Sequence, residues 1–236
     1  MDINKFMTPR LLCVASFVKN EAIVADVGTD HAYIPIYLIT NETAKSALAM
    51  DINEGPLLRA KENIERFNLE DKISTRLSDG LIKLKEGECD TVIIAGMGGI
   101  LINRILDNSK NLYPHIKNYI LQPMTAVEET RKFLEENGFF IENERLAKED
   151  NKIYTVISVK RGSMKIENEI DYYIGKKLIE NKDELLESLL NGKIYELEKA
   201  IESMKNTDNS EILEKRNHFI YLKNEMEKIR EECMSW

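Results

Sequence analysis

The segment Ile23-Val24-Ala25-Asp26-Val27-Gly28-Thr29-Asp30-His31-Ala32-Tyr33-Ile34-Pro35 decides the fold. Its first five residues are mostly apolar and β-branched, which predicts a buried strand. Gly28 permits a tight turn, and Pro35 fits the first turn of a following helix. In an open α/β sheet, ligands lie beyond the carboxyl ends of the strands, near helix N-termini. The segment therefore predicts a strand, a turn and a helix that frame a ligand site.

Polar side chains gather around this turn. Asp26 ends the strand, and Asp30, His31 and Tyr33 follow the glycine. Asp26 can accept hydrogen bonds from a ligand or hold the turn, and Gly28 lets the backbone approach a ligand closely. The alternative is a simple β–α turn whose glycine serves geometry only, with His31 stabilising the turn.

Acidic residues also follow the next two predicted strands. The strand 44–50 ends at Asp51-Ile52, 25 residues after Asp26. A carboxylate in this place accepts two hydrogen bonds from a ribose diol, although it could equally cap the next helix. The strand 73–77 is followed by Asp79-Gly80, which could accept a bond from an adenine amino group or form an ordinary turn.

The fourth predicted strand, 89–95, is almost continuously apolar, which is typical of a central parallel strand buried on both faces. Ala95 leads directly into Gly96-Met97-Gly98-Gly99, and a helix is expected over 100–106. Three glycines in four residues at a strand end indicate close backbone approach or positive φ. We interpret Gly96 and Met97 as the floor of a reaction site, with a flexible turn as the alternative.

Flanking segments complete the predicted domain. Thr8 and Pro9 open a helix, on which Arg10 is either solvated or in contact with a phosphate. A fifth strand covers 119–122. Thr125 is expected to cap a helix that ends at Asn137, with Glu128 placed for a capping box. Strands 139–146 and 153–160, joined by the charged loop 147–152, predict an antiparallel hairpin that closes a parallel sheet.

The composition changes after Arg161-Gly162-Ser163, and no strand-like run follows. Apolar residues recur at nearly heptad spacing over 182–204 and again over 219–233. The turn 206–209, with Asp208 as a predicted helix cap, predicts an antiparallel helical hairpin. We therefore expect an α/β domain over 1–162 and a helical coiled-coil domain over 163–236.

Composition restricts the class of protein. The chain has 236 residues, and its 43% apolar content is enough for a globular core. Its formal net charge of −8 argues against nonspecific coating of DNA. Cys13, Cys89 and Cys233 are isolated, so neither a metal site nor a redox pair is expected. The first residues lack a charged segment followed by an apolar core, so no signal peptide is expected, and no apolar run has membrane-spanning length. We therefore expect a cytoplasmic protein without membrane contact.

The predicted nucleotide site lacks phosphate-binding signatures. Gly28 is not followed by the remaining glycines of G-x-G-x-x-G, and no G-x-x-x-x-G-K is present. A cationic sulfonium donor has no phosphate and tolerates nearby carboxylates such as Asp26 and Asp30. Seven strands are predicted, and the last two follow each other without a helix between them. This pattern fits the mostly parallel, Rossmann-like sheet of S-adenosylmethionine-dependent (class I) methyltransferases better than a dehydrogenase sheet.

The chain resembles the bacterial TrmK family of tRNA (adenine-22, N1) methyltransferases. The resemblance rests on Ala25–Pro35, on Ala95-Gly96-Met97-Gly98-Gly99, on Leu121-Gln122-Pro123-Met124, and on the order of the two domains. The glycine-rich segment stands where many nucleic-acid amino methyltransferases carry an Asn/Asp-Pro-Pro-Tyr motif. The resemblance implies S-adenosylmethionine as cofactor and tRNA as substrate.

On this hypothesis, two sets of residues form the site. The cofactor is expected to contact Asp26, Gly28, Asp30, His31, Asp51, Ile52, Asp79, Gly80, Ala95 and Gly96. The reaction is expected to involve His31, Tyr33, Gly96 and Met97, with Tyr33 able to stack on a base.

Adenine N1 has a lone pair and no proton to lose, so no general base is required before attack. Catalysis then consists of positioning the reactants and exposing a base that is stacked or paired in tRNA.

Other functions remain open from the sequence. A nucleotide-dependent oxidoreductase, a methyltransferase for another RNA, a protein or a small molecule, and a non-enzymatic binding module each fit part of the pattern.

Overall fold

The computed structural model describes residues 1–206 and 208–233. These residues form two compact units, which divide between Lys165 and Ile166. Thr207, in the predicted turn 206–209, and the last three residues of the expected helical domain lie outside the described residues. Each unit is described by itself.

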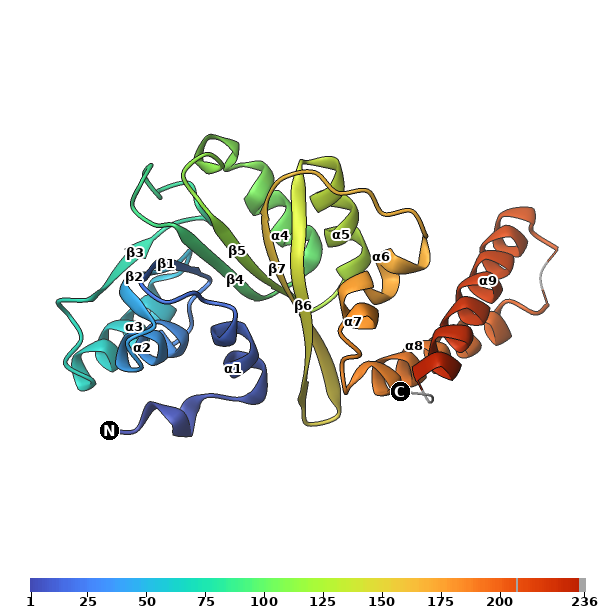
Figure 1. The fold of residues 1–236 in the computed structure, drawn as a ribbon, viewed down its shortest axis with the longest axis horizontal. Coiled ribbons are helices and arrows are strands. Elements are labelled where there is room, and N and C mark those ends of the chain that lie inside the picture. The colour runs from blue at the N-terminus through green and yellow to red at the C-terminus, as the bar shows by residue number, and fades with distance from the viewer. Residues whose placement is uncertain (207, 234–236) are drawn as a thin grey trace. The chain divides into compact units, whose positions relative to one another are not determined.

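The first unit is built on one seven-stranded sheet with the order β3-β2-β1-β4-β5-β7-β6. Strands β1 to β5 are parallel, β7 is antiparallel to β5, and β6 is antiparallel to β7 (Figure 1). The strands are β1 (Ala22–Val27), β2 (Ala44–Asp51), β3 (Ile73–Leu77), β4 (Thr91–Met97), β5 (Asn118–Pro123), β6 (Phe139–Glu149) and β7 (Lys152–Arg161). The predicted mostly parallel sheet closed by a hairpin is confirmed.

Helices cover both faces of this sheet. Successive strand residues point to opposite sides, so the apolar strands have two apolar faces for helices to bury. Val24 packs with residues of α1, α2 and α3, whereas Ala25 and Val27 pack with residues of α4 and α5. The helical elements of this unit are η1 (Ile3–Phe6), α1 (Pro9–Ser16), α2 (Tyr33–Thr40), α3 (Glu54–Arg66), α4 (Gly99–Asp107), η2 (Lys110–Leu112) and α5 (Val127–Glu136). This three-layer arrangement leaves the carboxyl ends of β1 to β5 along one edge.

The β6–β7 hairpin is longer than the sequence indicates. The expected loop 147–152 is wrong, because β6 continues to Glu149 and the turn contains only Asp150 and Asn151. Asp150 adopts a φ of 54°, which permits this tight reversal. Since Leu121 of β5 pairs with Ile157 of β7, the tip of the hairpin extends past the carboxyl end of β5 (Figure 1).

Two expected helix caps are also wrong. Thr125 does not cap α5, because its carbonyl oxygen accepts the Gly99 backbone N–H at 2.8 Å and Ala126 occupies the N-cap position with φ 53°. The cap of α9 is Asn209 and not Asp208, because Asn209 Oδ1 accepts the backbone N–H groups of Glu211 and Ile212. In both cases a neighbouring residue supplies the turn.

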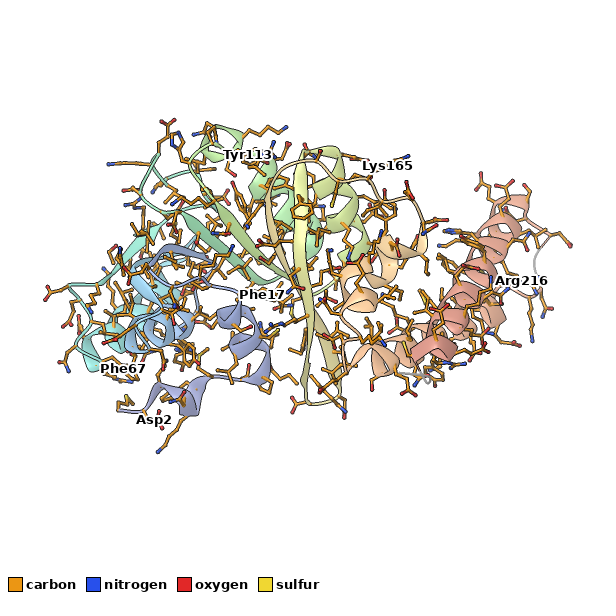
Figure 2. All side chains as sticks on the ribbon, viewed as in Figure 1. Asp2, Phe17, Phe67, Tyr113, Lys165 and Arg216 are labelled. Atoms are coloured by element: carbon orange, nitrogen blue, oxygen red, sulfur yellow. The ribbon has the colours of Figure 1, made fainter. Side chains whose placement is uncertain are left out.

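Aromatic packing stabilises the sheet at the amino-terminal end of β5, away from the carboxyl ends of the parallel strands. Tyr113, labelled in Figure 2, packs edge-on against Phe139 with ring centroids 4.9 Å apart, and Tyr119 packs edge-on against the same ring. The Arg161 guanidinium lies over both Tyr113 and Phe139. This cluster fixes the start of β5 to the end of β7.

The second unit is helical. It contains α6 (Ile170–Ile174), α7 (Lys176–Glu180), α8 (Leu186–Ser203) and α9 (Ser210–Cys233). The helix α8 begins four residues after the start of the heptad-like segment 182–204, because Lys182 has φ 51° and the chain turns before Leu186. Lys223 pairs with Glu198 and Arg230 with Asn191, so α8 and α9 run antiparallel as predicted. Within the part of the chain that is described, no helix is long and apolar enough to cross a membrane.

One buried ion pair ties α5 to the hairpin. Arg131 Nε donates to Glu144 Oε1 at 2.8 Å, and both side chains are 1% exposed. Breaking a buried pair by removing one partner leaves an uncompensated charge, whereas removing both is far less costly.

We expect Arg131→Met to lower the free energy of unfolding by about 3–5 kcal/mol, measured by urea denaturation. The double variant Arg131→Met/Glu144→Leu should recover part of this loss. Lys132→Met, which removes a surface cation paired with Glu129 on the same helix, is the matched control and should cost below about 1 kcal/mol. A single variant no worse than this control would contradict the assignment.

Candidate functional site

The carboxyl ends of three neighbouring strands are joined by backbone hydrogen bonds. The N–H groups of Gly28 and Thr29, after β1, both donate to the Met50 carbonyl of β2, at 2.8 and 2.9 Å. The Ser78 N–H, after β3, donates to the Asp51 carbonyl at 2.8 Å. The predicted residues after these strands are therefore held along one edge of the sheet.

Gly28 is required at its position for two reasons. Its φ is 76°, a conformation that L side chains rarely adopt, and a Cβ there would lie 2.1 Å from Met97 Cε. The Met97 side chain, from the end of β4, thus packs directly over the β1 turn. This contact places two of the predicted motifs against each other.

The turn continues through two residues with left-handed backbone conformations. His31 has φ 69° and Ala32 has φ 56°, although neither is glycine. Asn63 of α3 donates to the His31 carbonyl at 3.1 Å and so helps to hold this segment. Such conformations persist only where the surroundings over-determine them, and they concentrate at ligand-binding and active sites.

The side chains of this segment form a short aromatic stack. The Tyr33 ring stacks with His31 at 5.0 Å and with Phe6 at 5.1 Å between centroids. Asp30 accepts two hydrogen bonds from Arg59 and lies 3.6 Å from His31 Nε2. The His31 imidazole is therefore oriented from two sides while about a third of it remains exposed.

Asp26 is a buried carboxylic acid, only 6% exposed. It lies in the central strand β1, where Ala49 of β2 and Ile93 of β4 are its neighbours in register. Burial raises the pKa of Asp26 to about 6, and the nearby Asp51 carboxylate contributes to the rise. A cationic ligand in the pocket would favour the ionised form of this group.

Strand β4 does not end at Ala95 as predicted. The pairing with β5 is irregular between Ala95 and Met97, and Gly96 adopts φ 77°. The Gly96 N–H instead donates to Oε1 of Gln122 at 3.1 Å, and Gln122 is fully buried in β5. The glycine-rich segment is thus a fixed bulge held by a side chain, and not a flexible turn.

Arg10 was not among the predicted site residues, and it is not simply solvated. Its Nη1 donates to the same Gln122 oxygen at 2.8 Å, and its Nε lies 3.5 Å from Glu149 Oε2 at the hairpin tip. The guanidinium also lies 5.6 Å from the centre of the Tyr154 ring. A basic residue directly after the Thr8-Pro9 helix start, and a glutamine at the end of an apolar strand, were the available sequence signals.

These residues enclose a pocket of about 320 Å³. It is lined by Arg10, Leu11, Asp26, Gly28, Thr29, Asp30, His31, Tyr33, Ile34, Ala95 and Gly96. Seven of the residues predicted from the sequence are brought together here.

The other predicted residues lie outside this pocket. Asp51 and the exposed Ile52 follow β2, and the exposed Asp79 follows β3 on the same edge. Gly80 is buried with φ 54°, and a Cβ there would lie 3.0 Å from Ile105, so its place is set by the turn and by packing. The predicted site therefore consists of a half-open pocket at β1 and β4 and an exposed rim at β2 and β3.

The chemistry of this edge suits a ligand that carries positive charge. Asp26 and Asp51 place carboxylates beside the pocket, and Gly96 leaves space there, because a Cβ at this position would meet no atom closer than Arg10 Nη1 at 3.7 Å. Across the described residues 1–206 and 208–233, no group of three or more His, Cys, Asp or Glu side chains is placed to hold a metal ion.

Comparison with known proteins identifies the family. The family model described as TrmK, tRNA (adenine(22)-N(1))-methyltransferase, matches residues 24–231. The chain belongs to the TrmK family. The tRNA (adenine(22)-N(1))-methyltransferase of Bacillus subtilis is 39% identical over 156 residues, which cover 66% of each protein.

Solved TrmK-type structures agree with this assignment. The structure of Mycoplasma capricolum TrmK with S-adenosylhomocysteine is 33% identical, covers 96% of this chain and 97% of its own, and superposes with a TM-score of 0.78. Streptococcus pneumoniae Sp1610 in complex with S-adenosyl-L-methionine is 32% identical, with coverage of 95% and 99% and a TM-score of 0.86. The predicted methyltransferase fold, family and cofactor class are confirmed, and the oxidoreductase alternative is set aside.

The raised pKa of Asp26 predicts a cost to the ligand-free TrmK-family fold. A folded-state pKa of about 6 against an ordinary 3.8 means that stability is lost as pH rises between these values. We expect Asp26→Asn to be more stable than the wild type by about 1–3 kcal/mol at pH 7.5, by chemical denaturation without ligand, and nearly equal to it at pH 4.

Asp79→Asn, which removes an exposed carboxylate from the same edge, is the matched control and should show no such pH-dependent gain. If Asp26→Asn is destabilised at pH 7.5, the carboxylate is compensated within the protein, and the expected cost does not exist.

Proposed function

We propose that this protein transfers a methyl group from S-adenosylmethionine to N1 of adenine 22 in tRNA. The observation that carries the proposal is the TrmK family match over residues 24–231, which includes both the Gly28 turn and the Gly96 bulge. Residues 1–162 would form the methyltransferase domain, and the helical residues 163–236 would contribute contacts to tRNA or to a partner. A tRNA substrate would place the enzyme in the cytoplasm.

The residues along the sheet edge fit the parts of the cofactor. Asp51 and Ile52 would hold the ribose and one face of the adenine, and Asp79 with Gly80 would lie beside its amino group. Gly28 and Gly96 would allow the backbone to approach the reacting end. Asp26 would face the cationic part of the ligand from the bottom of the pocket.

When bound, the cofactor supplies a methyl group on a sulfonium centre, and its transfer moves the positive charge to the adenine ring without releasing a proton. The protein is left with the tasks of positioning and electrostatics. The Gln122 side chain fixes the Gly96 bulge, which would lie beside the reacting atoms, and Met97, packed over Gly28, would shape the slot between cofactor and base. No residue is required to act as a base on N1.

The extruded adenine needs an apolar or aromatic surface. Tyr33 and His31 are already stacked on each other, and the partly exposed His31 ring presents the face that a base could meet. In this proposal His31 and Tyr33 line the base pocket.

Nucleoside mass spectrometry tests the activity directly. Unmodified tRNA incubated with the purified protein and methyl-labelled S-adenosylmethionine should gain one labelled 1-methyladenosine, and a transcript in which adenine 22 is replaced by guanine should gain none. Label at another position or on another nucleoside would contradict the proposal. The proposal would also be contradicted if the protein bound S-adenosylhomocysteine but transferred no label to tRNA.

The ribose assignment has its own test. Asp51→Ala should weaken S-adenosylhomocysteine binding in calorimetry by about tenfold or more, because two charge-assisted hydrogen bonds are lost. Asp71→Ala, an exposed carboxylate before β3, is the control and should bind normally. Unchanged affinity in Asp51→Ala would contradict its role.

A further inference from the structure

The first turn of α4 presents apolar side chains to solvent beside the Gly96 bulge. Ile100 is 62% exposed and Leu101 is 36% exposed, whereas Ile102 and Leu106 of the same helix are fully buried. Packing of the apolar face of α4 against the sheet accounts for the buried pair and not for the exposed pair. Single exposed apolar residues are ordinary, but these two lie four and five residues after Gly96, at the mouth of the site.

The backbone at the start of α4 fixes where these side chains lie. The Gly99 N–H donates to the Thr125 carbonyl oxygen at 2.8 Å, and a Cβ on Gly99 would lie 2.8 Å from the same oxygen. The start of α4 therefore contacts the loop after β5. Met124, directly before Thr125 in this loop, is 41% exposed. Because Ile100 follows Gly99, the three side chains of Ile100, Leu101 and Met124 form one exposed apolar area, the α4 patch.

The α4 patch is continuous with the proposed base site. The Met97 carbonyl oxygen accepts the Met124 N–H at 2.7 Å, and the Met97 side chain packs over Gly28. A base that enters the slot beside Met97 would therefore pass the patch. Apolar side chains at the mouth of a site for an extruded base are placed to contact the neighbours of that base.

A cation lies on the same face of α4. Arg104 is exposed and follows Ile100 by four residues, which places the two side chains on one side of the helix. In the described part of the chain, the Arg104 side chain makes no ion pair and no hydrogen bond, so its donors remain for a phosphate. An apolar patch with an adjacent arginine suits RNA better than a protein partner, because bases offer apolar faces and the backbone offers phosphates.

We propose that Ile100 enters the base stack of the tRNA at the place that adenine 22 leaves, while Arg104 binds a neighbouring phosphate. This inference rests on the proposed function, because it requires the adenine to move from a stack into the site. Unstacking a base is costly, and an apolar side chain that inserts between base steps offsets part of that cost. Leu101 and Met124 flank Ile100 and contact the bases on either side of the gap.

A fluorescent base reports extrusion without requiring activity. 2-Aminopurine at position 22 of a tRNA transcript is quenched while it is stacked and becomes bright when it leaves the stack. Saturating wild-type protein with S-adenosylhomocysteine should raise its fluorescence several-fold. Ile100→Ala should reduce this rise to below about half at saturation, whereas Ile100→Leu, which keeps the apolar volume, should retain most of it.

Kinetics provides a second readout. Ile100→Ala should lower kcat/KM for tRNA by about 10–100-fold, because the cost of unstacking is no longer offset. A transcript with an abasic residue opposite adenine 22 is easier to unstack, so the loss should shrink to about threefold or less. Ile82→Ala is the matched control, since Ile82 is 63% exposed and follows β3 on the same edge of the sheet. It should behave as the wild type in both assays.

The phosphate contact has a separate readout. Arg104→Gln should weaken tRNA binding and reduce the slope of log K against log salt by about one, because one fewer phosphate is neutralised. An unchanged salt slope would remove Arg104 from the proposal.

Calorimetry with S-adenosylhomocysteine distinguishes failure of this inference from failure of the proposed function. Each variant should bind this ligand as tightly as the wild type, which also shows that it is folded. An unchanged fluorescence rise and an unchanged kcat/KM in Ile100→Ala would overturn the inference and leave the patch for a protein partner. Equal losses on the intact and abasic transcripts would overturn it too, since Ile100 would then be a wall of the base pocket. A wild type that binds S-adenosylhomocysteine but neither brightens 2-aminopurine nor methylates tRNA would instead refute the proposed function.

Discussion

The buried carboxyl group of Asp26 is the constraint on which the rest of the site depends. It lies in the middle of a parallel sheet, between Ala49 and Ile93, where few polar groups are available to compensate a charge. Removing a carboxylate from water is costly unless a cation or hydrogen bonds replace the water. A fold that keeps an acid there gains from a positively charged ligand, and a sulfonium donor with an ammonium group is such a ligand.

The remaining features of the site keep this pocket open and shaped. Gly28 and Gly96 take positive φ values, and the Met97 side chain occupies the space above Gly28. Gln122 accepts hydrogen bonds from both the Gly96 backbone and Arg10, so one buried amide couples the bulge of β4 to the N-terminal helix. The extended β6–β7 hairpin brings Glu149 and Tyr154 to the same arginine. The site is therefore assembled from five separate parts of the chain.

The sequence predicted the fold and the edge that carries the site because those features depend on local signals. Apolar runs ended by an acid or a glycine, such as the one at Asp26 and Gly28, mark both a strand and its ligand-facing end. Arg10 and Gln122 were missed as a pair because their contact spans 112 positions, and no local pattern encodes it. The caps at Thr125 and Asp208 were misassigned because the tertiary bond from Gly99 and the neighbouring Asn209 compete for those positions.

Proton release during ligand binding tests the central claim most directly. If binding of a cation lowers the pKa of Asp26 from about 6, calorimetry of S-adenosylmethionine at pH 6, without tRNA and in buffers of different ionisation enthalpy, should show release of up to about half a proton per site. Asp26→Asn should abolish most of this release, whereas His31→Gln, which removes the imidazole from the same pocket, should retain it. Proton uptake, or the same release from wild type and Asp26→Asn, would contradict the account.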